Sequence, residues 1–184
     1  MGRRSARDRR RRLRGRGVAH TLRMDWNHYR FRCSWGLEAE PEAVYAVLER
    51  LEAYPEWWPQ IREVRRTGET TGVLRMRSLL PYDLTVTVHS ARQDADAGVL
   101  QVAMAGDLEG WARWTVRPAG SRGGTRAGGR AALVEYAQEV DVTKPLMRAL
   151  AVPCRPLFRA NHALMMRSCR AGLRVRLGGA RLPV

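Results

Sequence analysis

Three residues could move or orient a proton at an apolar site: Tyr136, Asn161 and His162. Histidine titrates near neutral pH, so His162 could remove an α-proton or protonate a departing oxygen, as an aldol cyclisation or a dehydration requires. Asn161 and Tyr136 could orient a carbonyl or a phenol by hydrogen bonding. These three are the candidate catalytic residues. An inert structural role is the alternative for each of them.

Helical periodicity predicts how Asn161 and His162 are placed. At about 100° per residue, an apolar group falls within about 60° of Asn161: Leu157, Phe158, Leu164 and Met165. We therefore expect Asn161 at the centre of the buried face of a helix and His162 on its flank, facing either a cavity rim or solvent. An unpaired buried amide costs about 1 to 3 kcal/mol, so Asn161 should bond to a neighbour, a water or a ligand.

Two adjacent tryptophans form the most distinctive local feature. Trp57 and Trp58 lie between Pro55 and Pro59. Proline fixes φ and lacks a backbone donor, so the prolines should end helical hydrogen bonding on both sides and hold the indoles in a turn. We expect this pair at the mouth or floor of an apolar cavity. Plugging one end of an ordinary core is the alternative.

Alternation along the strands predicts further residues that face this cavity. Tyr136 shares a strand face with Val134 and Gln138, and Trp114 shares one with Ala112 and Val116. Ordinary core packing is the alternative for any one of them, and methionine in particular fills gaps. The expected ligand-binding residues are Trp57, Trp58, Met76, Tyr82, Met104, Trp114, Phe158 and Met165.

Periodicity and turn residues also predict the elements that position these side chains. A strand over 28–37 precedes a helix over 41–51 and the tryptophan turn. Six strands follow, over 61–67, 73–79, 84–92, 99–105, 110–117 and 131–142. Pro145 then opens a long helical region that reaches about residue 177 and is interrupted near Pro153 and Pro156.

This order of elements predicts an α+β fold of the helix-grip type. Short turns favour antiparallel neighbours, which gives a seven-stranded antiparallel sheet with two short helices after its first strand. The sheet must cover its apolar face, and only the C-terminal helix is long enough, so the sheet should curve around that helix. The space between sheet and helix is then a natural ligand cavity.

Charge divides the chain into a basic segment and a domain. The 184 residues carry a net charge of +15, of which residues 1–23 contribute +9 through ten arginines and one aspartate. This segment has almost nothing apolar, so we expect it to be disordered. The remaining length suits a single ligand-binding domain over 24–178, followed by a disordered C-terminus over 179–184.

The arginine-rich segment has three interpretations: contact with nucleic acid or an anionic membrane, targeting, or translated sequence upstream of the natural start. Arginine outnumbers lysine 32 to one, as expected from a GC-rich genome, in which spurious arginine-rich upstream codons arise readily. This favours Met24 as the start. Nucleic-acid binding is expected only through the segment, and deleting residues 1–23 would then abolish that binding and its steep salt dependence.

Other function classes lack their usual motifs. There is no nucleotide-binding or hydrolase fingerprint, and we expect no cofactor and no metal. Cys33, Cys154 and Cys169 are odd in number and widely spaced, which argues against a disulfide framework or a zinc site and favours the cytoplasm. No apolar run approaches the ~20 residues that span a bilayer. The oligomeric state is not predicted.

Four motifs together resemble those of bacterial proteins of the START-like (SRPBCC) superfamily, and in particular its polyketide cyclase/dehydrase-like group. They are YPEWWPQ at 54–60, SLLPY at 78–82, GDLEGWARW at 106–114 and FRANH at 158–162. The resemblance extends over roughly residues 27–177. It implies a helix-grip fold around an apolar ligand cavity. It is much less specific for a reaction, because the superfamily includes cyclases, lipid carriers and hormone-binding proteins.

The expected function is binding of a small hydrophobic ligand, of aromatic, polyketide or lipid type, in the cavity between sheet and helix. Cyclisation or dehydration is its enzymatic version, and a non-catalytic carrier or sensor of lipids or quinones is the alternative. One unpaired polar group with an ordinary pKa would favour the carrier. Two or three convergent polar groups with a perturbed histidine would favour the enzyme.

Overall fold

The computed structural model describes residues 27–77, 82–120, 131–149 and 153–178. The expectations for residues 1–23, for a start at Met24 and for residues 179–184 lie outside these ranges. Most of the SLLPY motif, residues 78–81, also lies outside them.

Seven antiparallel strands form a single sheet in the order β1-β7-β6-β5-β4-β3-β2. The strands are β1 (His28–Leu37), β2 (Ile61–Arg66), β3 (Thr71–Arg77), β4 (Asp83–Asp94), β5 (Val99–Gly106), β6 (Leu108–Pro118) and β7 (Ala132–Val142). Strands β2 to β7 form a meander, and β1 pairs with β7 along its whole length. This confirms the predicted α+β architecture, with β4 and β6 longer than expected.

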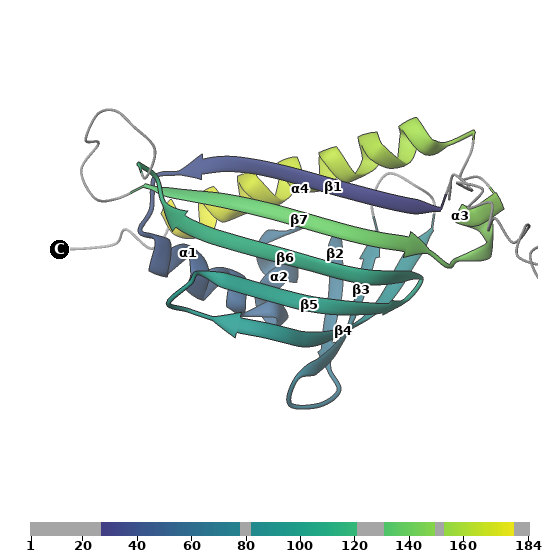
Figure 1. Cartoon of the computed structure of the whole chain (residues 1–184), viewed down its shortest axis with the longest axis horizontal. Helices are drawn as coiled ribbons and strands as arrows, with labels where there is room; N and C mark the ends of the chain where they lie inside the picture. Colours follow the sequence, from purple (N-terminus) through teal and green to yellow (C-terminus); the bar gives the residue numbers. More distant parts are fainter. Residues whose placement is uncertain (1–26, 78–81, 121–130, 150–152, 179–184) are drawn as a thin grey trace, which may run out of the picture.

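Two register shifts bend the sheet. One lies between Ser90 and Arg92 where β4 pairs with β5, and the other between Ile61 and Glu63 where β2 pairs with β3. Such bulges increase the local twist of a strand. They help the sheet to curve around the long C-terminal helix, which runs along one face of the sheet in Figure 1.

The helices lie where the prolines predict, except that Pro55 lies in the first turn of a helix and does not end one. After β1 come α1 (Pro41–Glu49), a short 3₁₀ turn η1 (Leu51–Ala53) and α2 (Tyr54–Trp57). The C-terminal region forms two helices, α3 (Pro145–Ala149) and α4 (Arg155–Gly178). Pro55 and Pro156 each lie in the first turn of a helix, where a missing backbone donor is tolerated. Pro55 therefore begins the tryptophan turn and does not interrupt it.

The tryptophan turn is held against α4 at a glycine. A Cβ atom placed on Gly172 would lie 1.8 Å from the backbone oxygen of Trp57, so only glycine allows the two backbones to approach this closely. Trp58 Nε1 donates to the backbone oxygen of Met165 at 3.1 Å, and Gln60 Nε2 donates to Ser168 Oγ at 3.0 Å. These contacts fix α2 on the helix that covers the sheet.

Candidate functional site

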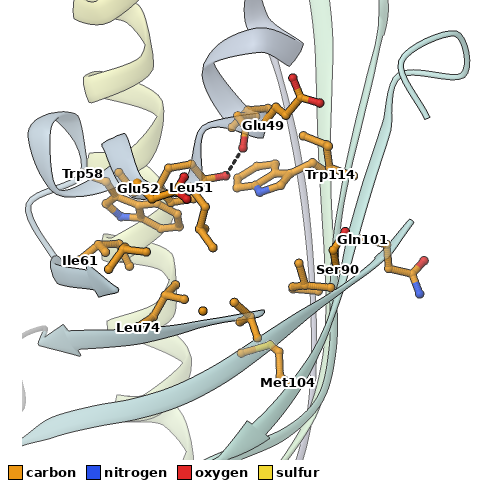
Figure 2. Close-up of a pocket in the computed structure, with 18 of the residues that line it drawn as sticks. Glu49, Leu51, Glu52, Trp58, Ile61, Leu74, Ser90, Gln101, Met104 and Trp114 are labelled. Carbon is orange, nitrogen blue, oxygen red and sulfur yellow. Dashed lines mark hydrogen bonds between the residues drawn. The ribbon is translucent and has the colours of Figure 1, made fainter. Parts of the chain in front are cut away.

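The main cavity lies between α4, the helical segment from α1 to α2, and strands β2 to β7, with a volume of about 210 Å³. Figure 2 shows its apolar walls, with Trp58 and Leu74 on one side, Trp114 on the other and Met104 at the base. Charged residues also line it, and all of them are exposed, so they mark its opening: Glu49, Glu52, Arg66, Glu69 and Arg92.

A polar cluster of Tyr136, Gln138 and His162 lies in the wall of the main cavity. The Tyr136 hydroxyl donates to Gln138 Oε1 at 3.0 Å, and His162 Nε2 lies 3.2 Å from the same oxygen. Because that oxygen can only accept, Nε2 carries the proton of a neutral His162 and the lone pair lies on Nδ1. Gln138 is the only buried residue with an amide or charged side chain in the described part of the core.

Burial sets the protonation state of this cluster. Desolvation lowers the pKa of His162 to about 4, so the imidazole is neutral at physiological pH. Desolvation also raises the pKa of Tyr136, which keeps its proton. The cluster therefore offers hydrogen bonds without carrying a charge.

His162, and not Asn161, occupies the centre of the buried face of α4. At about 100° per residue, six apolar residues fall within about 60° of His162, and all are buried or half-buried: Phe158, Met165, Met166, Cys169, Leu173 and Leu177. The expectation that placed Asn161 at the centre was wrong because Leu157 and Leu164, which point the same way as Asn161, are 46% and 40% exposed.

A second pocket of about 80 Å³ lies beside the main cavity, towards α3. Met76, His162 and Met165 line both spaces. Tyr29, Tyr82 and Phe158 line only the second pocket. The hydroxyls of Tyr29 and Tyr82 are buried and have no hydrogen-bond partner within the described ranges.

The structure brings most of the predicted residues to these two spaces. The main cavity contains Trp58, Met76, Met104, Trp114, Tyr136, His162 and Met165. The second pocket adds Tyr82, Phe158 and Asn161. Trp57 lines neither space. It is 7% exposed, stacks on Trp58 with ring centroids 5.9 Å apart and packs in the core, as the alternative interpretation of the tryptophan pair allowed.

Gln138, Tyr29 and Phe31 are site residues that the sequence analysis missed. A signal for them was present in the alternation of the strands: Gln138 shares a face with Tyr136, and Tyr29 and Phe31 share one along β1. Alternation shows which residues share a strand face. It does not show whether that face borders a cavity or is filled by other side chains, because this depends on packing.

Some further features bear on function. Cys33, Cys154 and Cys169 are free thiols. Among the residues that the structure describes, no three His, Cys, Asp or Glu side chains are arranged to hold a metal ion, and no helix is long and apolar enough to cross a membrane.

Comparison of the sequence with protein families gives a match over most of the chain. Residues 37–165 match the family described as polyketide cyclase / dehydrase and lipid transport. A comparison with curated protein sequences gives no match.

Solved structures share the fold at low sequence identity. The chain is 16% identical to a START superfamily protein from Mycobacterium smegmatis, with a TM-score of 0.61 over 82% of this chain and 98% of that one. It is 11% identical to the Zhui aromatase/cyclase from Streptomyces sp. R1128, with a TM-score of 0.64 over 85% and 97%. A protein from Thermus thermophilus is 17% identical, with a TM-score of 0.64 over 84% and 100%. These likenesses confirm the START-like helix-grip fold.

Proposed function

The chain belongs to the polyketide cyclase/dehydrase and lipid transport family, and from this premise we propose that it binds a small hydrophobic molecule in the main cavity. The observation that carries the proposal is the cavity itself, with apolar walls, an opening marked by charged residues and a volume of about 210 Å³. An apolar cavity of about 150 Å³ can hold a benzene molecule. The main cavity therefore suits a ligand with one or two rings, or the end of an acyl chain.

The polar cluster would orient such a ligand. Tyr136 and His162 both donate to one oxygen of Gln138, so a ligand oxygen could accept from either donor in its place. Because the cluster is neutral, a carbonyl or hydroxyl group suits it better than an ion, whose burial would go uncompensated.

Cyclisation or dehydration is the second candidate function, and the convergence of three polar groups on one cavity wall favours it. With its proton on Nε2, His162 could take an α-proton at Nδ1. The lowered pKa of about 4 argues for the binding role, however, because a general base works best with a pKa near the working pH.

Native mass spectrometry of the full chain purified from its own host, followed by denaturation, would test the binding role. A stoichiometric apolar molecule is the expected result. Ala112→Phe should expel it, because Ala112 lines the cavity. Ala103→Phe is the matched control, since Ala103 is exposed on the neighbouring strand. A ligand retained equally by Ala112→Phe would place binding elsewhere, and an empty wild-type protein would count against a tight carrier.

Turnover of short poly-β-ketones would test the enzymatic candidate. His162→Gln can still donate to Gln138 but cannot accept an α-proton. We expect an enzyme to lose turnover in this variant while it keeps affinity for the product. Equal rates for the variant and the wild type would leave only the carrier role.

A further inference from the structure

The solvent-facing side of α4 is apolar along most of the helix. Seven residues lie within about 40° of the direction opposite His162, and all of them are exposed. Two are Arg167 and Gly178. The other five form what is hereafter the apolar stripe: Leu157, Ala160, Leu164, Ala171 and Val175. Val175 is 76% exposed. From Leu157 to Val175 the stripe runs for about 27 Å. Solvent-facing positions of a helix are ordinarily polar, so this face calls for an explanation.

Arginines flank the apolar stripe on one side. Arg159, Arg167, Arg170 and Arg174, hereafter the arginine stripe, lie between about 60° and 140° from His162 around the helix. Helix α4 holds six arginines and no acidic residue. Arg155 contacts the Tyr29 ring and the backbone of His28, and Arg176 pairs with Glu56. The arginine stripe has no ion pair in the described part of the chain.

Ion pairs are common among the arginines of the sheet. Six of the ten arginines in the strands pair with a carboxylate: Arg30, Arg66, Arg75, Arg77, Arg92 and Arg117. The arginine stripe, by contrast, has no carboxylate on its own helix and lies next to the apolar stripe.

We propose that the outer face of α4 docks on an anionic membrane surface, with the apolar stripe at the boundary of the acyl chains and the arginine stripe on lipid phosphates. This pairing of an apolar face with flanking basic residues is what an interfacial helix requires. Nucleic acid would use the arginines but leave the leucines and Val175 exposed. A second copy of the chain would bring like charges together. The docking does not depend on the ligand, although α4 also forms a wall of the main cavity.

Flotation of the full chain with vesicles tests this. We expect binding to phosphatidylcholine vesicles that contain about 30% phosphatidylserine and little binding to pure phosphatidylcholine. Replacing Arg159, Arg167 and Arg174 together by Gln should weaken binding about 100-fold, at roughly 1 kcal/mol per arginine. Leu164→Ser with Val175→Ser should weaken it about 10-fold, and Ala171→Leu should strengthen it. All these positions are exposed, so thermal unfolding should be little changed.

The arginine-rich N-terminal segment supplies the matched control. Replacing Arg10, Arg11 and Arg12 by Gln removes the same charge from residues 1–23 and should affect binding less than the variant in α4. The proposal is overturned if only the N-terminal variant loses binding. It is equally overturned if the serine variants bind like the wild type, since the attraction would then be purely electrostatic. Sedimentation velocity tests for a dimer. If the wild type is a dimer and the Leu164→Ser, Val175→Ser double variant is a monomer, α4 instead binds a second copy of the chain.

Discussion

His162 and Phe31 stack face to face, with ring centroids 3.7 Å apart and ring planes 8° from parallel. Phe31 comes from β1 and His162 from the centre of the buried face of α4, so the contact joins the helix to the edge of the sheet. It covers one face of the imidazole while Nε2 reaches Gln138. The stacking thus explains both the burial of the ring and its orientation towards the polar cluster.

Acid should destabilise the protein through His162. Its folded-state pKa of about 4 lies below the ordinary value near 6.5, so the unfolded chain binds the proton first as the pH falls. The stability that the neutral ring contributes is complete above about pH 6.5 and is lost as the pH falls towards 4, by on the order of 1 to 3 kcal/mol. Denaturant unfolding at a series of pH values should show this slope in the wild type and a smaller one in His162→Gln. The exposed His89→Gln is the control, and an unchanged slope in His162→Gln would contradict the assignment.

Gln138→Leu should lower the free energy of unfolding by about 2 to 4 kcal/mol, because two buried donors lose their acceptor. Chemical denaturation at neutral pH measures this, with the exposed Gln93→Leu as the control. A loss no larger than that of the control would mean that other groups satisfy Tyr136 and His162.

Gln138→Glu keeps an acceptor oxygen at this position and adds a negative charge to it. A carboxylate at hydrogen-bond distance favours the imidazolium, so the pKa of His162 should rise above its value of about 4. Titration of the His162 ring protons by NMR measures the shift. A pKa that stays near 4 would show that Nε2 does not face this side chain.

The fold could be predicted from the sequence because its signals are local. Alternation in β1 and turn residues such as Gly98 and Gly106, both with positive φ, delimit the strands. The centre of the α4 face could not be predicted, since Leu157 and Leu164 are apolar yet exposed. A helical wheel assumes that apolar residues are buried, and it fails on a helix with an apolar outer face.

The site was predicted less completely than the fold. Trp58 and Trp57 are neighbours in the sequence, but only Trp58 reaches the cavity. The close contact of Trp57 with Gly172 decides this, and it joins residues that are far apart in the chain. Gln138 was visible on the correct strand face, but its two hydrogen-bond partners depend on how α4 is rotated on the sheet.

Gly172→Ala should destabilise the protein by about 1 to 3 kcal/mol through overpacking, although alanine normally favours a helix by up to about 1 kcal/mol over glycine. The added Cβ would meet the Trp57 backbone oxygen, so α2 must move and carry Trp58 away from the main cavity. Thermal unfolding and ligand retention should both decrease. Gly36→Ala is the control, because no atom lies within 4 Å of a Cβ built there. Equal stability of the two variants would mean that α2 is not fixed by this contact.

Two buried tyrosines should respond in opposite ways to loss of the hydroxyl. The Tyr54 hydroxyl donates to the backbone oxygen of Leu48 at 2.7 Å, so Tyr54→Phe leaves a buried acceptor short of a partner and should cost about 1 kcal/mol. The Tyr29 hydroxyl has no partner in the described structure, so Tyr29→Phe removes an unsatisfied group and should leave the free energy of unfolding unchanged or raise it. Denaturant unfolding of the two variants compares the same chemical change at two sites. A clear destabilisation by Tyr29→Phe would show that its hydroxyl is bonded in solution, by water or by a ligand held in the second pocket.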